Sequence, residues 1–389
     1  MSDIKELYNN ILPTYGRQPV DFVSGKGCRL WDSAGNEYID FMSGIGVCSV
    51  GHAHPAWVEA VTNQAQTLAH TSNLYYTLPG GLLAKRLCAL SGLGGTFFAN
   101  SGAESNEGLF KLARKYSRDK YGEGRSTILT LENSFHGRTL AALSATGQPS
   151  FHRHFHPFPQ GFRHIKAGDI EQLSMQGEDV CALMIELVQG EGGVRPLDIS
   201  YVQQAAKLCQ ERDWLLLIDE VQTGIGRTGH WFAFQGYDIQ PDAVSFAKGI
   251  AGGLPLGGFL VNDRLKDVLQ PGDHATTFGA NPICCAAALA TLDILEEILP
   301  KISEKGEYIR KSIEGMNLPN IAEIRGMGLM LGVRIEGLGH AEVNSMLLKA
   351  GLAALIAGAD IIRFLPPLII EKADIDRGLE IFQNVLSKA

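Results

Sequence analysis

The sequence has no long apolar run. No stretch of its 389 residues approaches the about 18 apolar residues that a membrane-spanning helix requires. The N-terminal residues, from Met1 to Tyr8, mix charged and polar side chains and lack the apolar centre of a secretory signal. These absences argue against a membrane protein and against a secreted one, and they predict a cytoplasmic location.

Positive charge and paired cysteines are also scarce. Lysine and arginine number 34 against 42 acidic residues, and the resulting net charge of −8 argues against nucleic acid or an anionic membrane as the main partner. The cysteines are odd in number and lack CxxC spacing, which favours buried free thiols over a disulfide or zinc framework. They are Cys28, Cys48, Cys88, Cys181, Cys209, Cys284 and Cys285.

The sequence does contain short apolar runs that alternate with segments of helical periodicity. Runs at 95–98, 127–131 and 180–185 fit this rhythm, which predicts an α/β protein with a large, mainly parallel sheet covered by helices. A hairpin over 26–41 and long helices after residue 281 predict a smaller α+β domain built from both chain ends. The expected division is residues 1–50 and 281–389 for the small domain and 51–280 for the large one.

Two apolar runs each end in one ionisable residue. Leu215–Ile218 leads into Asp219, and Ala243–Ala247 leads into Lys248, which follows Asp219 by 29 positions. Ligands of open α/β sheets bind at the carboxyl ends of the strands, where these two side chains would meet. The pair suits pyridoxal phosphate, because an amine can form the Schiff base and a carboxylate can keep the pyridine nitrogen protonated. Taken singly, the aspartate is equally compatible with capping a loop and the lysine with reaching solvent.

Three further strand ends carry polar or glycine-rich groups. Ser101–Ala103 opens a predicted helix, whose N–H groups can hold a phosphate, although a serine there is also an ordinary N-cap. Phe135 could cover a flat heteroaromatic ring or simply belong to the core. Glu186–Gly193 places two carboxylates in a glycine-rich turn. Combined with Asp219 and Lys248, these groups predict a cofactor site more specifically than any one of them.

Three other kinds of site are disfavoured. Gly224–Gly229 matches the dinucleotide pattern GxGxxG, but Glu220 to Thr223 separate it from the preceding strand and an aromatic run follows it. His152, His154 and His156 alternate along the chain without a nearby set of carboxylates or cysteines, so a solvated loop is favoured over a metal site. The sequence contains no GxxxxGK[ST] motif, which argues against an ATPase.

Several motifs together resemble those of the class III pyridoxal-phosphate aminotransferases. They are Phe135-His136-Gly137-Arg138, Gln189-Gly190-Glu191-Gly192-Gly193, Asp219-Glu220-Val221-Gln222-Thr223-Gly224, Lys248 and Thr276-Thr277-Phe278-Gly279-Ala280-Asn281-Pro282. Within that family the chain is most similar to the acetylornithine aminotransferases, from the early hairpin to Arg363 near the C-terminus. The resemblance implies aminotransferase fold type I, pyridoxal 5'-phosphate as cofactor, and a homodimer with shared active sites.

The resemblance also implies individual roles. Lys248 would be the Schiff-base lysine, Asp219 would pair with the pyridine nitrogen, and Phe135 would stack on the ring. Further cofactor contacts are expected from Ser101, Gly102, Ala103, Gln222 and Thr277. Substrate contacts are expected from Arg138, Thr276, Glu191, Arg363 and Tyr15, and no metal is expected. Ala103 stands where the family often has threonine, which removes one hydroxyl from the phosphate site. Thr276 and Thr277 would reach the partner subunit's site.

The implied reaction transfers the δ-amino group of N2-acetyl-L-ornithine to 2-oxoglutarate, in arginine biosynthesis. Arg138 would bind the far carboxylate of either substrate, and Arg363 would bind the α-carboxylate of glutamate. Glu191 would cover Arg363 during the other half-reaction, unless the two form a permanent structural ion pair.

Other donors stay open, namely ornithine, 4-aminobutyrate, succinylornithine and succinyldiaminopimelate. An aminomutase of the same fold would turn over without 2-oxoglutarate. Ile45 lies where related ornithine enzymes tend to have a tyrosine, which disfavours ornithine as the donor.

Overall fold

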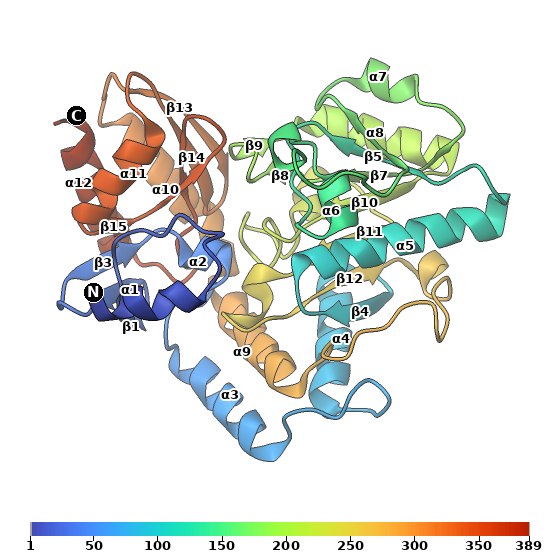
Figure 1. The fold of residues 1–389 in the computed structure, drawn as a ribbon, viewed down its shortest axis with the longest axis horizontal. Helices are drawn as coiled ribbons and strands as arrows, with labels where there is room; N and C mark the ends of the chain where they lie inside the picture. The colour runs from blue at the N-terminus through green and yellow to red at the C-terminus, as the bar shows by residue number, and fades with distance from the viewer. Residues whose placement is uncertain (1, 389) are drawn as a thin grey trace.

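The computed structural model describes residues 2–388, and its largest element is a seven-stranded sheet in the order β4-β12-β11-β10-β7-β5-β6 (Figure 1). The strands are β4 (Gly95–Ala99), β5 (Thr127–Leu131), β6 (Phe162–Ile165), β7 (Val180–Ile185), β10 (Leu215–Asp219), β11 (Ala243–Phe246) and β12 (Gly257–Val261). Strands β6, β5, β7, β10 and β11 run parallel, whereas β12 is antiparallel to both β11 and β4. The predicted α/β class with a mainly parallel sheet is therefore confirmed.

Helices cover both faces of this sheet, and the strand sequences explain why. In β10, Leu215 and Leu217 pack in one apolar cluster with Leu109 of helix α5 (Gly102–Tyr121). Leu216 and Ile218 belong to the other cluster, which contains Val202 of helix α8 (Ile199–Arg212). Because successive side chains of a strand face opposite sides, a continuous apolar run is what a doubly covered strand needs.

Seven helices flank or follow the large sheet in the described residues. They are α3 (Pro55–Thr67), α4 (Leu78–Ser91), α5 (Gly102–Tyr121), α6 (Leu140–Ala145), α7 (Ile170–Ser174), α8 (Ile199–Arg212) and α9 (Pro282–Ile298). Short 3-10 turns connect these elements: η2 (Pro149–Phe151), η3 (Ala233–Tyr237), η4 (Lys248–Ala251), η5 (Asp263–Leu265) and η6 (Leu299–Lys301). A small two-stranded ribbon pairs β8 (Val188–Gln189) with β9 (Arg195–Pro196).

Two smaller sheets hold the chain ends. One contains β1 (Phe22–Lys26), β2 (Arg29–Asp32), β3 (Glu37–Asp40) and β15 (Leu352–Ala353); the other contains β13 (Ile321–Met327), β14 (Met330–Ile335), β17 (Ile361–Phe364) and β16 (Leu355–Ala357). The accompanying helices are α1 (Ser2–Leu7) with η1 (Tyr8–Asn10), α2 (Ser43–Gly46), α10 (Ile302–Glu314), α11 (His340–Lys349) and α12 (Lys372–Leu386).

The two ends of the chain join through β3 and β15, which pair in parallel. Figure 1 shows the blue N-terminal segment against the orange and red C-terminal segments. The fold class expected from the sequence, a large sheet domain with a smaller domain built from both chain ends, is confirmed. The boundaries expected at residues 50 and 280 stay a prediction.

One local detail differs from the sequence-based expectation. The hairpin expected over 26–41 has an additional strand, β1, before it. In the C-terminal sheet, β13 and β14 pair in antiparallel register, and Gly328 turns the chain between them with a φ of 53° that favours glycine.

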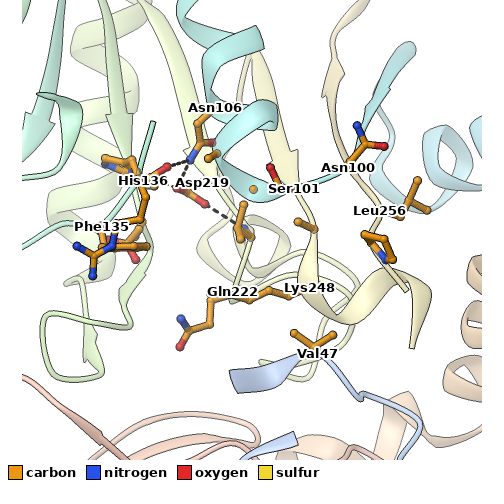
Figure 2. A pocket seen from close by; sticks show the side chains of 18 of the residues that line it. Val47, Asn100, Ser101, Asn106, Phe135, His136, Asp219, Gln222, Lys248 and Leu256 are labelled. Atoms are coloured by element: carbon orange, nitrogen blue, oxygen red, sulfur yellow. Dashed lines mark hydrogen bonds and ion pairs between the residues drawn. The ribbon is translucent and has the colours of Figure 1, made fainter. Parts of the chain in front are cut away.

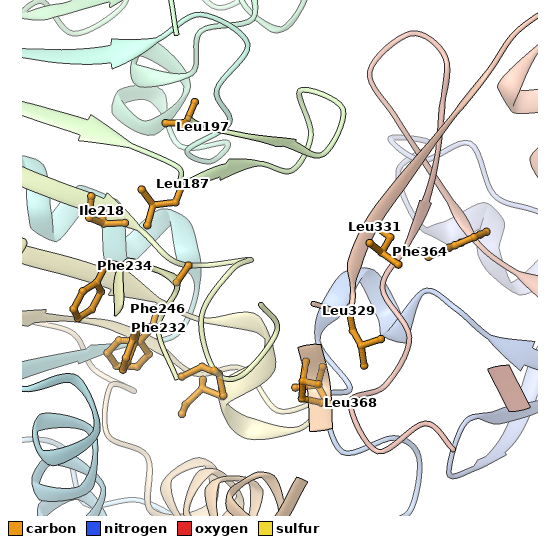
Figure 3. Packing of buried hydrophobic residues seen from close by; sticks show 14 of the residues in the cluster. Leu187, Leu197, Ile218, Phe232, Phe234, Phe246, Leu329, Leu331, Phe364 and Leu368 are labelled. Carbon is orange, nitrogen blue, oxygen red and sulfur yellow. The ribbon is translucent and has the colours of Figure 1, made fainter. Parts of the chain in front are cut away.

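One apolar cluster extends from the large sheet to the C-terminal sheet. Figure 3 shows members from both sides, with Phe232 and Phe246 beside the large sheet and Leu329, Phe364 and Leu368 on the C-terminal side. The two parts of the chain thus share buried apolar surface. Among residues 2–388, no helix is both long and apolar enough to cross a membrane.

Candidate active site

The carboxyl ends of the parallel strands border a cavity of about 440 Å³ (Figure 2). Eight of the residues predicted for the site line it, namely Ser101, Gly102, Ala103, Phe135, Arg138, Asp219, Gln222 and Lys248. Asp219 ends β10, and Lys248 follows the end of β11 by two residues. Since Asp219 pairs with Ser245 in the register of these neighbouring strands, the sheet itself brings the two ionisable residues together.

Asp219 is buried and surrounded by hydrogen-bond donors. Its Oδ2 accepts from Asn106 Nδ2 and from His136 Nδ1, both at 2.8 Å. Its Oδ1 accepts from the backbone N–H of Val221 at 3.0 Å and from Ser245 Oγ at 3.4 Å. Four donors suit an ionised carboxylate, because each bond stabilises the negative charge.

Asn106 and His136 are site residues to which sequence reasoning gave no role. Asn106 lies on the buried face of α5 and also donates to the backbone oxygen of His136 at 2.7 Å. Burial opposes a charge on His136, yet the hydrogen bond to Asp219 raises its pKa overall. His136 lies between Phe135 and Arg138 in the same motif, and this position is the sequence signal that could have identified it as a site residue.

Lys248 is held in a strained conformation. Its φ of 45° is uncommon for a residue with a side chain, and such strain often occurs at functional sites. Burial lowers the pKa of Lys248, although the carboxylate of Glu191 opposes this shift. In Figure 2 the lysine lies between Asp219 and Val47, near Gln222. A buried amine with a lowered pKa is more readily deprotonated than a lysine in water.

The N-terminus of α5 borders the same cavity. Ser101 is the N-cap, and its Oγ accepts from Glu104 N at 3.3 Å, so the ordinary capping role foreseen for this serine is present. Gly102 and Ala103 line the cavity at the first turn. A side chain at Gly102 would place its Cβ 2.6 Å from Val221, so only glycine fits there. Backbone N–H groups at the start of this 20-residue helix fit an anion such as a phosphate.

Phe135 and Arg138 stack next to each other at another wall. The Arg138 guanidinium lies 5.4 Å from the centre of the Phe135 ring and 4.1 Å from that of Phe151. Glu186 holds Phe135 by accepting from its backbone N–H at 2.9 Å, and it also accepts from Gly190 N at 3.3 Å. Burial raises the pKa of Glu186, which faces the cavity without a lysine or arginine partner.

Arg363 reaches the site from β17 of the C-terminal sheet. Its Nη1 donates to Glu191 Oε1 at 2.7 Å and to Gln222 Oε1 at 3.2 Å, and its side chain is only 3% exposed. Burial alone would raise the pKa of Glu191, but Arg363 outweighs it and lowers that pKa. The expected pair of Glu191 and Arg363 is thus present. Gln222, for which a cofactor contact is expected, lines the cavity and also accepts this bond from Arg363, and its cofactor role stays a prediction.

Five predicted residues do not line the cavity of the single chain: Glu191 and Arg363, which reach it through Gln222, and Thr276, Thr277 and Tyr15. Thr276 Oγ1 accepts from Asn100 Nδ2 at 3.2 Å at the rim of the cavity. Thr277 is exposed, and so is Tyr15, whose ring lies 5.7 Å from the Arg17 guanidinium. Their expected roles stay predictions.

The arrangement matches known proteins along almost the entire chain. A family model described as aminotransferase class-III matches residues 13–386. The sequence is 51% identical to an acetylornithine aminotransferase of Haemophilus ducreyi, over 99% of this chain and 98% of that protein. It is 44% identical to an acetylornithine aminotransferase of Methanocaldococcus jannaschii, again over 99% of this chain and 98% of that protein.

Solved structures agree with the sequence comparison. N-acetylornithine aminotransferase from Stenotrophomonas maltophilia superposes with a TM-score of 0.85 at 34% identity, over 98% of both chains. An ornithine aminotransferase from Toxoplasma gondii, with PLP at partial occupancy in its active site, superposes with a TM-score of 0.94 at 29% identity, over 99% of this chain and 94% of that one. The chain therefore belongs to the class-III aminotransferases, a family of pyridoxal-phosphate-dependent enzymes.

Proposed function

We propose that the protein is an acetylornithine aminotransferase. It would transfer the δ-amino group of N2-acetyl-L-ornithine to 2-oxoglutarate, yielding N-acetylglutamate 5-semialdehyde and L-glutamate. The observation that carries this proposal is the cavity in which Asp219 and Lys248 meet, with the Glu191–Arg363 pair beside it. The names of relatives that are 41–51% identical over nearly the full chain support the choice of substrate.

The residues of the cavity fit pyridoxal phosphate. The N–H groups of Gly102 and Ala103 would hold the phosphate, Phe135 would cover one face of the ring, and Asp219 would hold a proton on the ring nitrogen. The four donors around Asp219 fix the position of its carboxylate for that purpose. When bound, the cofactor supplies a protonated ring that withdraws electrons from the reacting carbon of the substrate.

Lys248 has the properties of a proton carrier at the reacting carbon. Its lowered pKa increases the fraction of neutral amine, which can accept a proton at neutral pH. Its position after β11 keeps the amine within the cavity, and its left-handed backbone fixes where the side chain begins. Ala247 and Leu256 also line the cavity, and their apolar side chains exclude water from the amine.

Two arginines can distinguish the two substrates. Arg138 is exposed to the cavity and has no carboxylate partner among the described residues, so it is available to a substrate carboxylate. Arg363 is buried and already paired with Glu191. Guanidinium groups bind carboxylates in bidentate fashion, and an unpaired buried arginine is costly. Glutamate would therefore displace Glu191 from Arg363, and acetylornithine would leave the pair intact.

We expect Arg363→Ala to impair one half-reaction selectively. The single-turnover rate with glutamate should fall by about 100-fold or more, as expected when a charged hydrogen bond worth about 3 kcal/mol is lost. The rate with N2-acetylornithine should change much less, because that substrate does not need Arg363. Rapid mixing with each donor, followed by absorbance of the cofactor, measures both rates. Equal losses in both half-reactions would show that the ion pair is structural.

The donor itself is tested with a panel of amines. N2-acetylornithine, ornithine, 4-aminobutyrate, succinylornithine and succinyldiaminopimelate are each supplied with 2-oxoglutarate, and glutamate formation is measured. We expect the highest kcat/KM for N2-acetylornithine. A higher value for ornithine would overturn the substrate assignment but not the aminotransferase activity. Turnover without 2-oxoglutarate would instead indicate an aminomutase.

We also propose a homodimer with shared sites. Leu74, Tyr75 and Tyr76 are almost fully exposed, and Asn73 ties this segment to the neighbouring loop through a 2.9 Å hydrogen bond to Gly279 O. The exposed ring of Phe278 belongs to the same loop. Contiguous exposed apolar side chains usually mark an interaction surface, and a second copy of the chain would bury these together with Thr277.

Mixing two inactive variants tests this arrangement. Lys248→Ala and Thr277→Ala chains, unfolded together and refolded, should form mixed dimers in which one site has both residues. If Thr277 acts on the partner's site, about a quarter of all sites should be intact and activity should return to that level. A fully active monomer in light scattering, or no recovery on mixing, would contradict the shared site.

A further inference from the structure

The loop Gly224–Gly229, which matches the dinucleotide pattern, contains a buried cation. Arg227 is only 2% exposed, and it lies where the large sheet meets the C-terminal sheet. Its Nη1 donates to Leu329 O at 3.0 Å and to Pro366 O at 2.5 Å. In addition, Leu329 N donates to Arg227 O at 3.0 Å.

The two carbonyl groups lie next to the adjacent ends of two neighbouring strands. Leu329 is in the turn before β14, and Pro366 follows β17, which pairs with β14 in antiparallel register. One guanidinium nitrogen therefore joins the adjacent ends of two strands to a loop of the large domain. In Figure 3, Leu329 and Leu368 lie at this junction, facing the phenylalanines of the large sheet.

The charge of Arg227 is stabilised by backbone carbonyl groups. Among the described residues no carboxylate forms an ion pair with it, and its Nη2 has no hydrogen-bond partner. Burial lowers the pKa of Arg227 to about 9, although Asp40 opposes the shift, so the group still carries its charge at neutral pH. A buried charge held only by backbone carbonyls is costly, and stability alone would be served as well by an apolar side chain.

The backbones at this junction also touch. Gly328 has a φ of 53°, and a Cβ there would lie 2.7 Å from Arg227 O. A Cβ at Gly226 would lie 3.3 Å from the side chain of Leu368. The glycine-rich loop therefore allows the turn between β13 and β14 to approach closely enough for Arg227 to reach it.

The same two chain segments meet again inside the active site. Gln222 precedes Arg227 by five residues, and Arg363 precedes Pro366 by three. Arg363 Nη1 donates to Gln222 Oε1 at 3.2 Å. The segments 222–227 and 363–366 are thus linked at both ends, once in the cavity and once behind it.

We propose that Arg227 is a positioning residue that fixes the guanidinium of Arg363 in the active site. By holding the ends of β14 and β17 against the large domain, it keeps Arg363 in reach of Glu191, Gln222 and the α-carboxylate of glutamate or 2-oxoglutarate. The substrate part of this inference rests on the proposed function. Displacement of a binding group by about 1 Å can cost up to about 100-fold in rate, so a contact outside the cavity can control the reaction.

The test compares Arg227→Met and Arg227→Lys in the intact enzyme. Methionine keeps most of the volume but removes the donors, so the single-turnover rate with glutamate should fall by about 10- to 100-fold. The rate with N2-acetylornithine should fall much less. Lysine keeps one charged donor and should restore part of the glutamate rate. If the methionine variant does not fold, the lysine variant should show the same selective loss in smaller degree.

A double-mutant cycle separates positioning from general stability. In an Arg363→Ala background, Arg227→Met should reduce the glutamate rate little further, because its effect passes through Arg363. Fully additive losses would overturn the proposal, as would equal losses in both half-reactions of Arg227→Met. Failure of Arg363→Ala itself to discriminate between the substrates would instead show that the Glu191–Arg363 pair is structural, and it would remove the proposed substrate role of Arg363. The coupling between the two arginines is measured independently of that result.

Arg125→Met provides a matched control. Arg125 also binds backbone carbonyl groups, those of Val180, Arg212 and Asp213 at 2.7–2.8 Å. It lies at the amino-terminal ends of β5 and β7, the sheet edge opposite the cavity. Its replacement should lower the melting temperature without changing the ratio of the two half-reaction rates. A change in that ratio equal to the change in Arg227→Met would show that any destabilisation has this effect.

Discussion

Replacing Lys248 by alanine is expected to reduce turnover by more than about 10⁴-fold, since the variant lacks the group that moves the proton at the substrate carbon. Lys248 follows the end of β11 by two residues, and it lines the cavity with Asp219 and Gln222. Among the side chains that line this cavity, no other amine is present to replace it. The measurement is the rate of glutamate formation from N2-acetylornithine and 2-oxoglutarate, with far-ultraviolet circular dichroism to verify folding.

Lys305→Ala is a suitable control for this substitution. Lys305 is likewise partly buried, and burial lowers its pKa as it does for Lys248. It lies on α10, where its Nζ donates to Leu368 O at 3.3 Å, and it does not line the cavity. We expect its replacement to leave kcat within a few-fold of the parent protein.

The lysine that forms the Schiff base with the cofactor can be identified by chemical labelling. After borohydride treatment of the purified enzyme, peptide mapping should find the label only on the peptide that contains Lys248. A label on another lysine, or unchanged activity in Lys248→Ala, would refute this assignment.

The central pair of the site could be predicted from sequence because both residues end apolar strands. Asp219 and Lys248 follow runs that only a doubly covered sheet accommodates, and parallel strands bring their carboxyl ends to one edge. The fold class followed from the same alternation of strands and helices. The proximity of Asp219 and Lys248 and the fold class both follow from local sequence patterns, so neither requires knowledge of how distant segments pack.

The environment of Asp219 could not be predicted in this way. Asn106 is five residues into α5, and only the packing of that helix on the sheet brings its amide within 2.8 Å of Asp219. The strand β12 could not be predicted either. It begins with Gly257 and Gly258, which weaken the strand pattern, and its reversed direction depends on the connection from η4.

The GxGxxG match in Gly224–Gly229 is another case in which local sequence does not identify the group that a segment contacts. A short glycine-rich pattern predicts that the backbone of the loop closely approaches another group. In the structure, the backbone of this loop does approach another segment closely. The neighbour in this structure is the turn at Gly328. Local sequence specified the glycines, whereas the identity of the neighbour depended on how the two parts of the chain pack.

Asp219→Asn is expected to lower kcat/KM by several orders of magnitude while lowering the stability by only about 1–3 kcal/mol. The cost to folding can be judged from the donors. With its oxygen toward Asn106 and His136, the new amide would direct its NH₂ group at Val221 N and Ser245 Oγ. The serine can accept, so a single donor–donor conflict remains, which costs about 1–3 kcal/mol of stability.

The loss of activity has a different origin and is much larger. A neutral amide cannot hold a proton on the ring nitrogen as the carboxylate can, and a neutral ring withdraws electrons poorly from the reacting carbon. His136 and Asn106 remain in place but present donors to a group that no longer carries the opposite charge. Activity should therefore fall far more than a loss of about 1–3 kcal/mol in stability would explain.

Asp242→Asn separates these two effects. Asp242 also accepts from several donors, the backbone N–H of Leu216 at 2.9 Å, Asn262 Nδ2 at 2.8 Å and Arg264 Nε at 3.0 Å, but it precedes β11 at the opposite edge of the sheet. Its substitution should reduce the free energy of unfolding at least as much as Asp219→Asn does, with kcat/KM of the folded enzyme retained. If Asp219→Asn kept most of its activity, or if Asp242→Asn lost as much, the charge of Asp219 would not be what the reaction requires.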